Sequence, residues 1–360
     1  MRVLAASTAG AGHFGPMAPF LRGCLAAGHD VLVAVPAGIR TDGFETRTLP
    51  GTPPEILGPI FGSLAGLPRP QANARVMREV FGGANVDATL AAHEALVDEW
   101  RPDLVVREVA EVGSYVAATR AGVPHVQVAL GLRAMEELLV GSLDGFADRY
   151  GVDPAPLLTT PTLSLVPPSM EPPDPHRTRY RDPAMAPTTG EPADELPPGD
   201  DPLVYVTYGS VAASLPPFRG VYRESLDALA DLPVRILMTT GDAGDPAELG
   251  DLPPNVRVVR WAPQDRVLPY ASVAVGHGGF GTTFGALAAG VPVAVRPLFS
   301  SDQFTNAAAV ARAGAGVVVD GPGALRDAVT GLLANDIARQ AARALADEIA
   351  ALPPADEWRP

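Results

Sequence analysis

Two histidines occupy positions where a parallel α/β sheet would present them to a ligand. His13 follows the first apolar run, Arg2–Ser7, and His277 follows a later one, Val273–Val275. Open α/β sheets bind ligands at the carboxyl ends of their strands. An imidazole there suits the removal of a proton from a hydroxyl, because its ordinary pKa of about 6.5 lies near working pH. Position alone leaves a second interpretation open for His13, in which it only caps the helix that follows.

Glycines surround the second histidine, in the run His277-Gly278-Gly279-Phe280-Gly281-Thr282-Thr283. They let the backbone approach an anion, and the helix that begins there offers free amides and the positive end of its dipole. The run therefore suits a diphosphate, although a tight turn before an alanine-rich helix would look similar. Upstream, Thr207-Tyr208-Gly209-Ser210 forms another small-residue turn, whose hydroxyls can donate to phosphate oxygens.

Four more residues complete the candidate ligand site in the second half of the chain. Trp261 and Gln264 belong to a Trp-Ala-Pro-Gln run after a predicted strand, where an indole can stack on a flat base and an amide can read its edge. Asp302 and Gln303 follow another strand, and a carboxylate beside an amide suits sugar hydroxyls. Each pair has an ordinary alternative, with Trp261 as a core aromatic and Asp302 as a helix N-cap.

The opening run Gly10-Ala11-Gly12-His13-Phe14-Gly15 fits the dinucleotide-binding pattern G-x-G-x-x-G. In that kind of site the second strand ends in Asp or Glu, which holds a ribose hydroxyl. Here the second strand ends Ala34-Val35-Pro36. We therefore interpret the run as a glycine-rich turn that lets another group approach closely, and expect no nicotinamide or flavin.

Short apolar runs alternate with helical patterns along most of the chain, which is typical of parallel sheets covered by helices. The predicted strands are Arg2–Ser7, Val31–Val35, Leu104–Arg107, His125–Val128, Thr162–Val166, Leu203–Thr207, Arg235–Thr239, Val256–Val259, Val273–Val275, Val291–Val295 and Gly316–Val319. The predicted helices are Ala18–Ala27, Asn73–Glu99, Glu111–Arg120, Ala134–Arg149, Arg219–Ala230, Thr282–Ala289, Gln303–Ala313, Gly323–Leu333 and Ile337–Leu352. This alternation predicts two α/β halves with a cleft between them.

A proline-rich stretch interrupts the alternation. Thirteen prolines lie between residues 151 and 200. We therefore expect a first domain at residues 1–195, which ends in a proline-rich connection at 150–195, and a second domain at residues 196–360. Two domains also suit the length, because 360 residues exceed what one ordinary core organises.

The composition excludes several classes of protein. A hydrophobic share of 47% and a charged share of 19% indicate a globular chain. The net charge of −14 makes nucleic acid and anionic membranes poor partners. Cys24 is the single cysteine, which excludes an internal disulfide framework and a cysteine-based zinc cluster. No run approaches the ~18 apolar residues of a membrane span and no secretory signal is evident, so we expect a cytoplasmic protein without stable membrane insertion.

Taken in order, the motifs resemble a known family. The runs Thr-Tyr-Gly-Ser, Trp-Ala-Pro-Gln, His-Gly-Gly-x-Gly-Thr and Asp-Gln-x-x-Asn-Ala resemble those of the family 1 (UDP-glycosyltransferase-like) enzymes. The chain looks most like the actinobacterial glycosyltransferases that decorate macrolides, enediynes and polyketides. An opening Gly-His-x-x-Pro-x-x-Pro, from Gly12 to Pro19, matches as well, so the resemblance covers nearly the whole chain. It implies an α/β protein of GT-B fold, with two Rossmann-like domains that face each other across a cleft.

The resemblance also implies a catalytic pair. His13 falls on the family's catalytic base, and Glu108 falls on the acidic residue that orients the base, where Asp is more usual. Glu111, one helical turn further on, is the alternative partner. The chain ends at Trp358-Arg359-Pro360, where relatives often continue with a few helical residues that cross back onto the first domain.

The remaining roles implied by the resemblance concern the donor. Trp261 and Gln264 fall on the platform for the nucleotide base, and Asp302 and Gln303 fall on the contacts to the donor sugar. The residues that fall on or near the diphosphate site are Ser210, His277, Gly278, Gly279, Gly281 and Thr282.

The function implied is an inverting, metal-independent transfer of a sugar or deoxysugar from a UDP- or dTDP-sugar. The acceptor would be a hydroxyl of a small apolar natural-product aglycone, although transfer to N, S or C remains open. No cofactor and no metal ligands are expected beyond the donor substrate. Two other functions remain open: a non-catalytic GT-B-like auxiliary protein that activates a partner enzyme, and a nucleotide-sugar epimerase of the same fold. The sequence also leaves open whether the chain forms a homodimer.

Overall fold

The computed structural model describes residues 1–188 and 191–360, and its internal contacts divide the chain into two compact units. Unit 1 comprises Met1–Leu165, Pro173–Asp182 and Pro353–Pro360, and unit 2 comprises Val166–Pro172 and Pro183–Leu352. The sequence places the domain boundary at residue 195. The structure assigns residues from Pro183 onward to unit 2 and returns the last eight residues to unit 1. Thr189 and Gly190, which fall in the predicted proline-rich connection, lie outside the described residues.

Unit 1 is built on a seven-stranded parallel sheet with the strand order β3-β2-β1-β4-β5-β6-β7. Its strands are β1 (Arg2–Ala6), β2 (Asp30–Pro36), β3 (Glu45–Leu49), β4 (Leu104–Glu108), β5 (His125–Val128), β6 (Thr162–Ser164) and β7 (Arg177–Arg179). Parallel strands covered on both faces read as continuous apolar runs, which is why β1, β2 and β4 could be predicted. The two strands that the sequence analysis missed, β3 and β7, are the edge strands, and β3 is polar and largely exposed.

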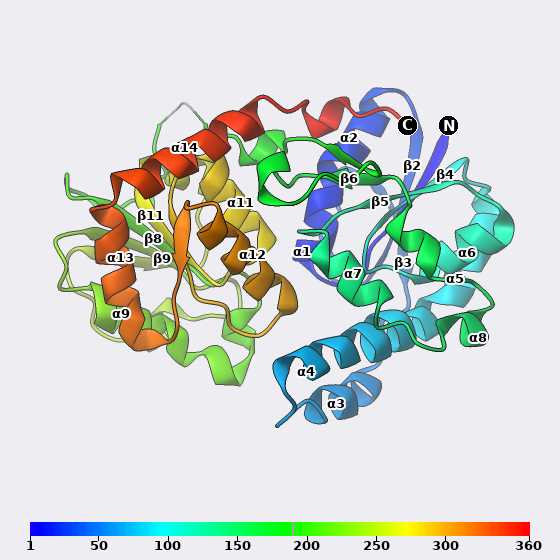
Figure 1. Ribbon diagram of the computed structural model, residues 1–360, viewed down its shortest axis with the longest axis horizontal. Coiled ribbons are helices and arrows are strands. Elements are labelled where there is room, and N and C mark those ends of the chain that lie inside the picture. The colour runs from blue at the N-terminus through cyan, green and yellow to red at the C-terminus, as the bar shows by residue number, and fades with distance from the viewer. Residues whose placement is uncertain (189–190) are drawn as a thin grey trace. The chain divides into compact units, whose positions relative to one another are not determined.

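Helices cover the faces of this sheet (Figure 1). They are α1 (Ala11–Phe14), α2 (Ala18–Ala26), α3 (Pro54–Gly62), α4 (Arg69–Val76), a π-helical segment (Met77–Ala84), α5 (Asn85–Trp100), α6 (Gly113–Ala121), α7 (Ala134–Val140) and α8 (Phe146–Tyr150). On one face, α5 and α6 pack against β1, β2 and β4 through a buried cluster that includes Leu4, Val105 and Leu96.

Two helices that the sequence predicts as continuous are interrupted in the structure. The helix predicted at Asn73–Glu99 is divided into α4, the π-helical segment and α5, with Gly82 packed directly against the side chain of Leu143. The helix predicted at Ala134–Arg149 stops at Val140 and resumes as α8 after Gly145, whose φ of +73° a right-handed helix does not accept. The helix α3 was not predicted.

Unit 2 repeats the same plan with a six-stranded parallel sheet in the order β10-β9-β8-β11-β12-β13. Its strands are β8 (Leu203–Thr207), β9 (Arg235–Thr239), β10 (Val256–Val259), β11 (Ala271–Gly276), β12 (Val293–Val295) and β13 (Gly316–Val318). Its helices are α9 (Gly220–Leu229), α10 (Gln264–Val267), α11 (Phe280–Ala288), α12 (Ser301–Arg312), α13 (Leu325–Leu333) and α14 (Asp336–Ala350). Figure 1 shows α9 and α13 on one side of this sheet and α11 and α12 on the other.

Each sheet has a point where the strand order reverses direction. In unit 1 it lies between β1 and β4, which pair from Val3 to Ala6. In unit 2 it lies between β8 and β11, which pair up to Thr207 and Gly276. Loops after two such strands diverge and leave room for a ligand at the carboxyl ends. The fold therefore brings the loop that holds His13 next to Glu108, and the loop that holds Ser210 next to His277.

The described residues, 1–188 and 191–360, include no helix with both the length and the apolar character that crossing a membrane requires.

The C-terminal segment is held in unit 1 by close backbone packing. Ala355 donates to the carbonyl of Arg181, and the ring of Trp358 meets Phe20 of α2 edge-on at 6.1 Å. A Cβ atom on Gly23 of α2 would lie 2.7 Å from the carbonyl oxygen of Asp356, which real contacts do not allow. The segment can lie against α2 only because position 23 has no side chain.

Gly23→Ala is therefore expected to lower the free energy of unfolding by about 1–3 kcal/mol, because either α2 or the segment must shift. It should also make residues 353–360 easier to remove by limited proteolysis. Gly58→Ala in α3 is the matched control, because a Cβ there meets nothing within 4 Å. Equal urea midpoints and equal cleavage rates for Gly23→Ala and wild type would contradict this packing.

Candidate functional site

His13 and Glu108 form a hydrogen-bonded pair at the carboxyl edge of the unit 1 sheet. His13 lies in α1, just after β1, and Glu108 is the last residue of the neighbouring β4. The Nδ1 atom of His13 is 3.1 Å from Oε1 of Glu108. The side chain of Glu108 is fully buried, whereas that of His13 is 25% exposed. The carboxylate thus holds one nitrogen of the ring while part of the imidazole stays accessible.

Other donors fix the carboxylate of Glu108. Thr8 donates to Oε1 from its amide (3.1 Å) and from its hydroxyl (2.8 Å), and the amide of Ala110 donates to Oε2 (2.5 Å). Burial by itself would raise the pKa of Glu108, but the charge and hydrogen bond of His13, the Ala110 amide and the Thr8 hydroxyl outweigh it and lower that pKa. An ionised carboxylate at Nδ1 favours the tautomer with the proton on Nδ1, which leaves the lone pair on Nε2.

Arg107, one residue before Glu108, is fully buried and holds the loop that follows β4. Its guanidinium donates to the carbonyl oxygens of Glu108, Val109 and Glu111 at 3.1–3.4 Å. It also donates to Oε1 of Gln127 at 2.6 Å. Burial lowers the pKa of Arg107, and the carboxylates of Glu111 and Glu108 partly offset this. A cation directly after the apolar run Leu104–Val106 was a sequence signal for this role, but no role for Arg107 was predicted from it.

The alternative partner for the base, Glu111, is engaged elsewhere. Its Oε1 lies 3.1 Å from Nε2 of His93, which is buried in α5. It also accepts from the amides of Gly113 (3.1 Å) and Ser114 (2.9 Å), which begin α6. Burial would raise the pKa of Glu111, but His93 and Ser114 lower it to about 2. The suggestion that Glu111 orients His13 is therefore wrong, because its carboxylate caps α6 and pairs with His93.

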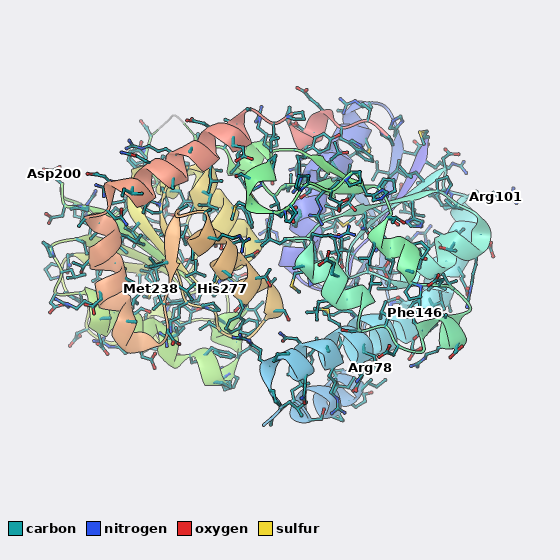
Figure 2. The ribbon with its side chains drawn as sticks, in the orientation of Figure 1. Arg78, Arg101, Phe146, Asp200, Met238 and His277 are labelled. Carbon is teal, nitrogen blue, oxygen red and sulfur yellow. The ribbon has the colours of Figure 1, made fainter. Side chains whose placement is uncertain are left out.

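In unit 2, His277, which is labelled in Figure 2, lies between two glycine turns. A Cβ on Gly209 would lie 2.7 Å from Cε1 of His277, and a Cβ on Gly279 would lie 2.5 Å from its Nε2. The turns after β8 and β11 thus enclose the imidazole from both sides. Burial lowers the pKa of His277 to about 4, although the carboxylate of Asp302 raises it somewhat. The ring is therefore neutral near pH 7.

The turn after His277 is clamped by α12. Gly278 has a φ of +91°, and a Cβ there would lie 2.6 Å from the carbonyl oxygen of Gln303, so both the conformation and the packing require glycine. The amide nitrogen of Asn306 donates to the carbonyl of Gly278 at 2.8 Å. Asn306 is completely buried and holds this turn in place. From the sequence it was known only as the asparagine of the Asp-Gln-x-x-Asn-Ala motif, with no role of its own.

The turn leads into the first residues of α11, which form an open helix N-terminus. Its N-cap residue, Gly279, is extended and has no side chain to accept from the first-turn amides. A Cβ on Gly281 would meet nothing within 4 Å. The amides that begin α11 are thus arranged as in sites that bind anions. The hydroxyl of Thr282 lies in the same first turn.

The other predicted donor residues are placed as follows. Trp261 is 67% exposed, so it is not a core aromatic. Gln264 begins α10, and its amide nitrogen donates to Tyr205 (3.2 Å) and Thr282 (3.1 Å), which are both groups of the protein itself. Ser210 is exposed in the turn after β8.

The two predicted residues after β12, Asp302 and Gln303, differ in their surroundings: Asp302 is partly exposed and Gln303 is buried. Asp302 bonds the hydroxyl of Ser300 and lies close enough to His277 to influence its pKa. Gln303 is 2% exposed, and its Oε1 accepts from the amides of Leu298 and Phe299 at 2.8 and 3.1 Å. The amide nitrogen of Gln303 is the remaining polar atom of that side chain for a ligand.

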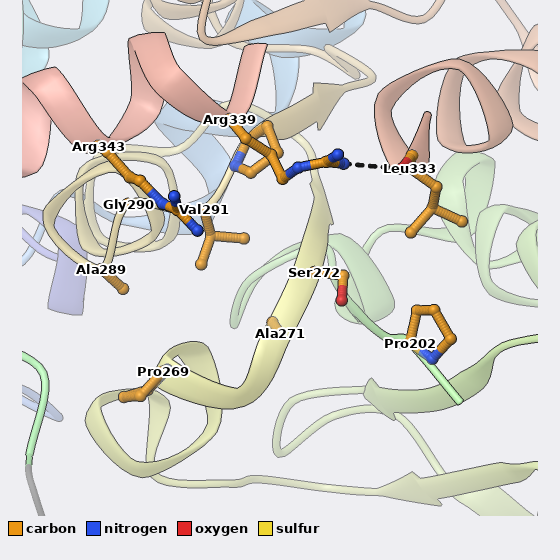
Figure 3. Close-up of a pocket in the computed structure, with 11 residues that line it drawn as sticks. Pro202, Pro269, Ala271, Ser272, Ala289, Gly290, Val291, Leu333, Arg339 and Arg343 are labelled. Carbon is orange, nitrogen blue, oxygen red and sulfur yellow. Dashed lines mark hydrogen bonds between the residues drawn. The ribbon is translucent and has the colours of Figure 1, made fainter. Parts of the chain in front are cut away.

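A separate pocket of about 460 Å³ lies at the other end of the unit 2 sheet (Figure 3). It is lined by Pro202 and Ser272 at the amino ends of strands and by Arg339 and Arg343 of α14. The predicted donor residues lie at the carboxyl ends of the same strands. This pocket is therefore not part of the candidate site. No cluster of three or more His, Cys, Asp or Glu side chains suited to a metal occurs in residues 1–188 and 191–360.

The chain is similar to glycosyltransferases over nearly its whole length. Residues 71–156 and 223–358 match the N-terminal and C-terminal domain models of the erythromycin biosynthesis protein CIII-like family. Elloramycin glycosyltransferase ElmGT of Streptomyces olivaceus is 33% identical, over 99% of this chain and 95% of the relative. L-demethylnoviosyl transferase of Streptomyces niveus is 35% identical, over 88% and 84%. The crystal structure of glycosyltransferase VinC in complex with dTDP superposes with a TM-score of 0.74 at 26% identity, over 99% and 97%.

The neutral state of His277 makes the stability of the chain depend on pH. The unfolded chain binds a proton at this residue near pH 6.5, and the folded chain does so only near pH 4. Between these values the unfolded state holds more protons, so the free energy of unfolding falls as the pH falls from about 6.5 to about 4. His277→Gln should reduce this fall by an amount on the order of 3 kcal/mol. Urea denaturation at pH 7 and pH 4.5 measures it.

The control for this prediction is His176→Gln, because His176 is exposed. It should leave the pH dependence of the wild type unchanged. A fall in stability of the same size in His277→Gln and wild type would show that His277 is not the group responsible.

Proposed function

Because the chain belongs to the erythromycin biosynthesis protein CIII-like family of glycosyltransferases, which have the GT-B fold, we propose that it transfers a sugar from a nucleoside diphosphate to a hydroxyl of a small apolar acceptor. The transfer inverts the anomeric configuration and requires no metal ion. The donor is a UDP- or dTDP-sugar, and dTDP is favoured because VinC holds it in the crystal.

The observation that carries this proposal is the pair formed by His13 and Glu108. An acceptor hydroxyl is a weak nucleophile and needs a base, and the carboxylate bonded to Nδ1 leaves Nε2 of His13 to take the proton. The buried charge of Glu108 then stabilises the imidazolium that forms, by the same logic as in a Ser-His-Asp site. Removal of a proton by such a positioned base contributes roughly 10²–10⁴ in rate.

Residues at the start of α11 stabilise the negative charge of the leaving group. Departure of a nucleoside diphosphate leaves negative charge on its phosphates, and helix N-termini and hydroxyls stabilise such charge. The first-turn amides of α11, the hydroxyl of Thr282 and the neutral imidazole of His277 supply these donors. We assign to these donors the role that a divalent cation has in metal-dependent transferases.

Inversion follows from the roles of the carboxylates. A retaining mechanism by double displacement needs a carboxylate nucleophile for a covalent sugar intermediate. The proposed mechanism uses Glu108 to hold the base, and Glu111 caps α6 and pairs with His93. The acceptor oxygen therefore attacks the sugar directly, in a single displacement.

The acceptor is proposed to be a small apolar aglycone. The ring of Phe81 lies 5.8 Å from that of His13 and provides an apolar neighbour for an acceptor beside the base. One relative is named for elloramycin, so glycosylated natural products are the class to test first.

The proposed function is tested by incubating the protein with UDP- and dTDP-sugars and a panel of aromatic polyketide and macrolide aglycones, with EDTA present throughout. Wild type should form a glycoside and release the nucleoside diphosphate, and NMR of the product should show the anomeric configuration inverted. His13→Ala should lower turnover by roughly 10²–10⁴, with the affinity for the free diphosphate unchanged by calorimetry.

Glu108→Gln tests the other member of the pair. Glutamine keeps the shape but loses the charge that stabilises the imidazolium, so turnover should fall while diphosphate affinity stays. Wild-type turnover in His13→Ala would refute the base assignment, and activity that disappears in EDTA would refute the metal-independent mechanism.

The role of Trp261 in holding the base is tested by Trp261→Ala. Because this indole is 67% exposed, its loss should leave the melting temperature unchanged and weaken dTDP and UDP by roughly 5- to 100-fold, the range of stacking on a base. Ile337→Ala, at another exposed apolar residue of unit 2 (75%), should change neither. Equal diphosphate affinities in Trp261→Ala and wild type would reject the stacking role.

A further inference from the structure

Gln264 uses both protons of its side-chain amide on groups of the protein. One N–H donates to the phenol oxygen of Tyr205 at 3.2 Å, and the other donates to Oγ1 of Thr282 at 3.1 Å. A primary amide has no further proton to give. Gln264 therefore cannot also donate to the edge of a nucleotide base without breaking one of these bonds.

The hydrogen bonds behind Gln264 fix which way its amide faces. Thr239 donates its hydroxyl proton to Thr207 at 2.7 Å, so it can only accept from the phenol of Tyr205, 3.3 Å away. Tyr205 spends its one proton in that bond and must accept from Gln264. This requires the nitrogen of Gln264, rather than its oxygen, to face Tyr205. The same nitrogen then faces Thr282.

The hydroxyl of Thr282 is consequently an acceptor toward Gln264 and keeps its own proton for another partner. In helices a threonine often donates to the carbonyl four residues earlier, which here is that of Gly278. The structure shows that carbonyl accepting from Asn306 at 2.8 Å and shows no bond to it from Thr282. Among residues 1–188 and 191–360 the structure shows no acceptor for the Thr282 proton.

The position of Thr282 indicates where that proton is used. The residue lies in the first turn of α11, beside the amides that the N-cap residue Gly279 leaves without a side-chain acceptor. Only 8% of the residue is exposed, so bulk water has little access to its hydroxyl. A phosphate oxygen bound at this N-terminus would be the natural acceptor.

We propose that Gln264 is a positioning residue for phosphate binding: by donating to Oγ1 of Thr282 it directs the hydroxyl proton of Thr282 onto a phosphate oxygen of the donor. The phenol oxygen of Tyr205 accepts from the same nitrogen of Gln264 and so fixes the orientation of its amide. This proposal rests on the proposed function, because it assumes a nucleoside diphosphate at α11. It adds an action through Thr282 to the expected reading of a base edge, in which Gln264 has only its oxygen left to take part.

The experiment is a double-mutant cycle of Gln264→Met and Thr282→Val, with dTDP and UDP affinities measured by calorimetry. Each substitution keeps the side-chain size and removes one partner. Each single variant should bind dTDP roughly 10- to 100-fold more weakly, the range for one hydrogen bond to a charged group. The double variant should bind no more weakly than Thr282→Val alone, because Gln264 acts only through that hydroxyl.

Two further variants make the test independent of folding defects. Thr282→Ser keeps the hydroxyl, so Gln264→Met in that background should again lose affinity. Tyr205→Phe removes a single buried oxygen, and its smaller loss should vanish in the Thr282→Val background. Gln264→Met should also weaken the binding of inorganic pyrophosphate, which has no base, whereas loss of a residue that reads only the base would leave pyrophosphate affinity unchanged.

The outcomes separate this proposal from the proposed function. If wild type binds neither dTDP nor UDP, the donor assignment fails and this proposal fails with it. If wild type binds but the effects of Gln264→Met and Thr282→Val multiply, or Gln264→Met binds as tightly as wild type, only the positioning role is overturned. Melting temperatures within a few degrees of wild type confirm that the variants compared are folded.

Discussion

An ionised carboxylate buried at the end of β4 is the interaction on which the proposed catalytic site in unit 1 depends. A buried carboxylate persists only where hydrogen bonds and opposite charge replace its hydration. The backbone and hydroxyl of Thr8, the amide of Ala110 and the ring of His13 do this for Glu108. Because Thr8 and His13 follow β1 while Glu108 ends β4, the parallel pairing of these two central strands is what assembles the group. The buried guanidinium of Arg107 then holds the loop that carries the Ala110 amide.

The donor site proposed for unit 2 has a different electrostatic requirement, because it must bind an anion although the chain carries a net charge of −14. It does so with dipoles rather than with a cluster of cations. Burial keeps His277 neutral, and the N-terminus of α11 presents its amides. The hydroxyl of Thr282 accepts a hydrogen bond from the side-chain nitrogen of Gln264. Dipoles that are fixed before a ligand arrives need little reorganisation, which is why such sites stabilise developing charge well. Both proposed sites thus lie at the point where the strand order reverses. In unit 1 the surrounding groups stabilise the buried charge of Glu108, and in unit 2 they are proposed to stabilise the charge of a bound phosphate.

Much of the fold could be predicted, because central parallel strands are buried on both faces and their apolar runs are continuous. The strands β5, β8 and β9, which lie inside their sheets, begin and end at the predicted residues. So does β10, an edge strand of unit 2 whose run Val256–Val259 is apolar apart from Arg257. The edge strands β3 and β7 were missed because an edge strand packs on fewer neighbours and carries polar residues, such as the run from Glu45 to Thr48. The breaks after α4 and α7 were missed because they depend on packing against other segments and on backbone angles, as at Gly82 and Gly145.

The sequence by itself determined which side chains stand at the strand ends, since that depends on short runs and the turns that follow them. His13, His277 and Thr282 were recognised in this way, whereas Glu108 was identified only through the resemblance to the family. Only the tertiary structure decided which side chains form hydrogen bonds with each other. His13 is bonded to Glu108 rather than to Glu111, and Gln264 donates to Thr282. His13 and Glu108 are 95 residues apart in the chain. Their contact depends on the order of strands in the sheet, and strand order depends on the packing of the whole unit rather than on any local run of residues.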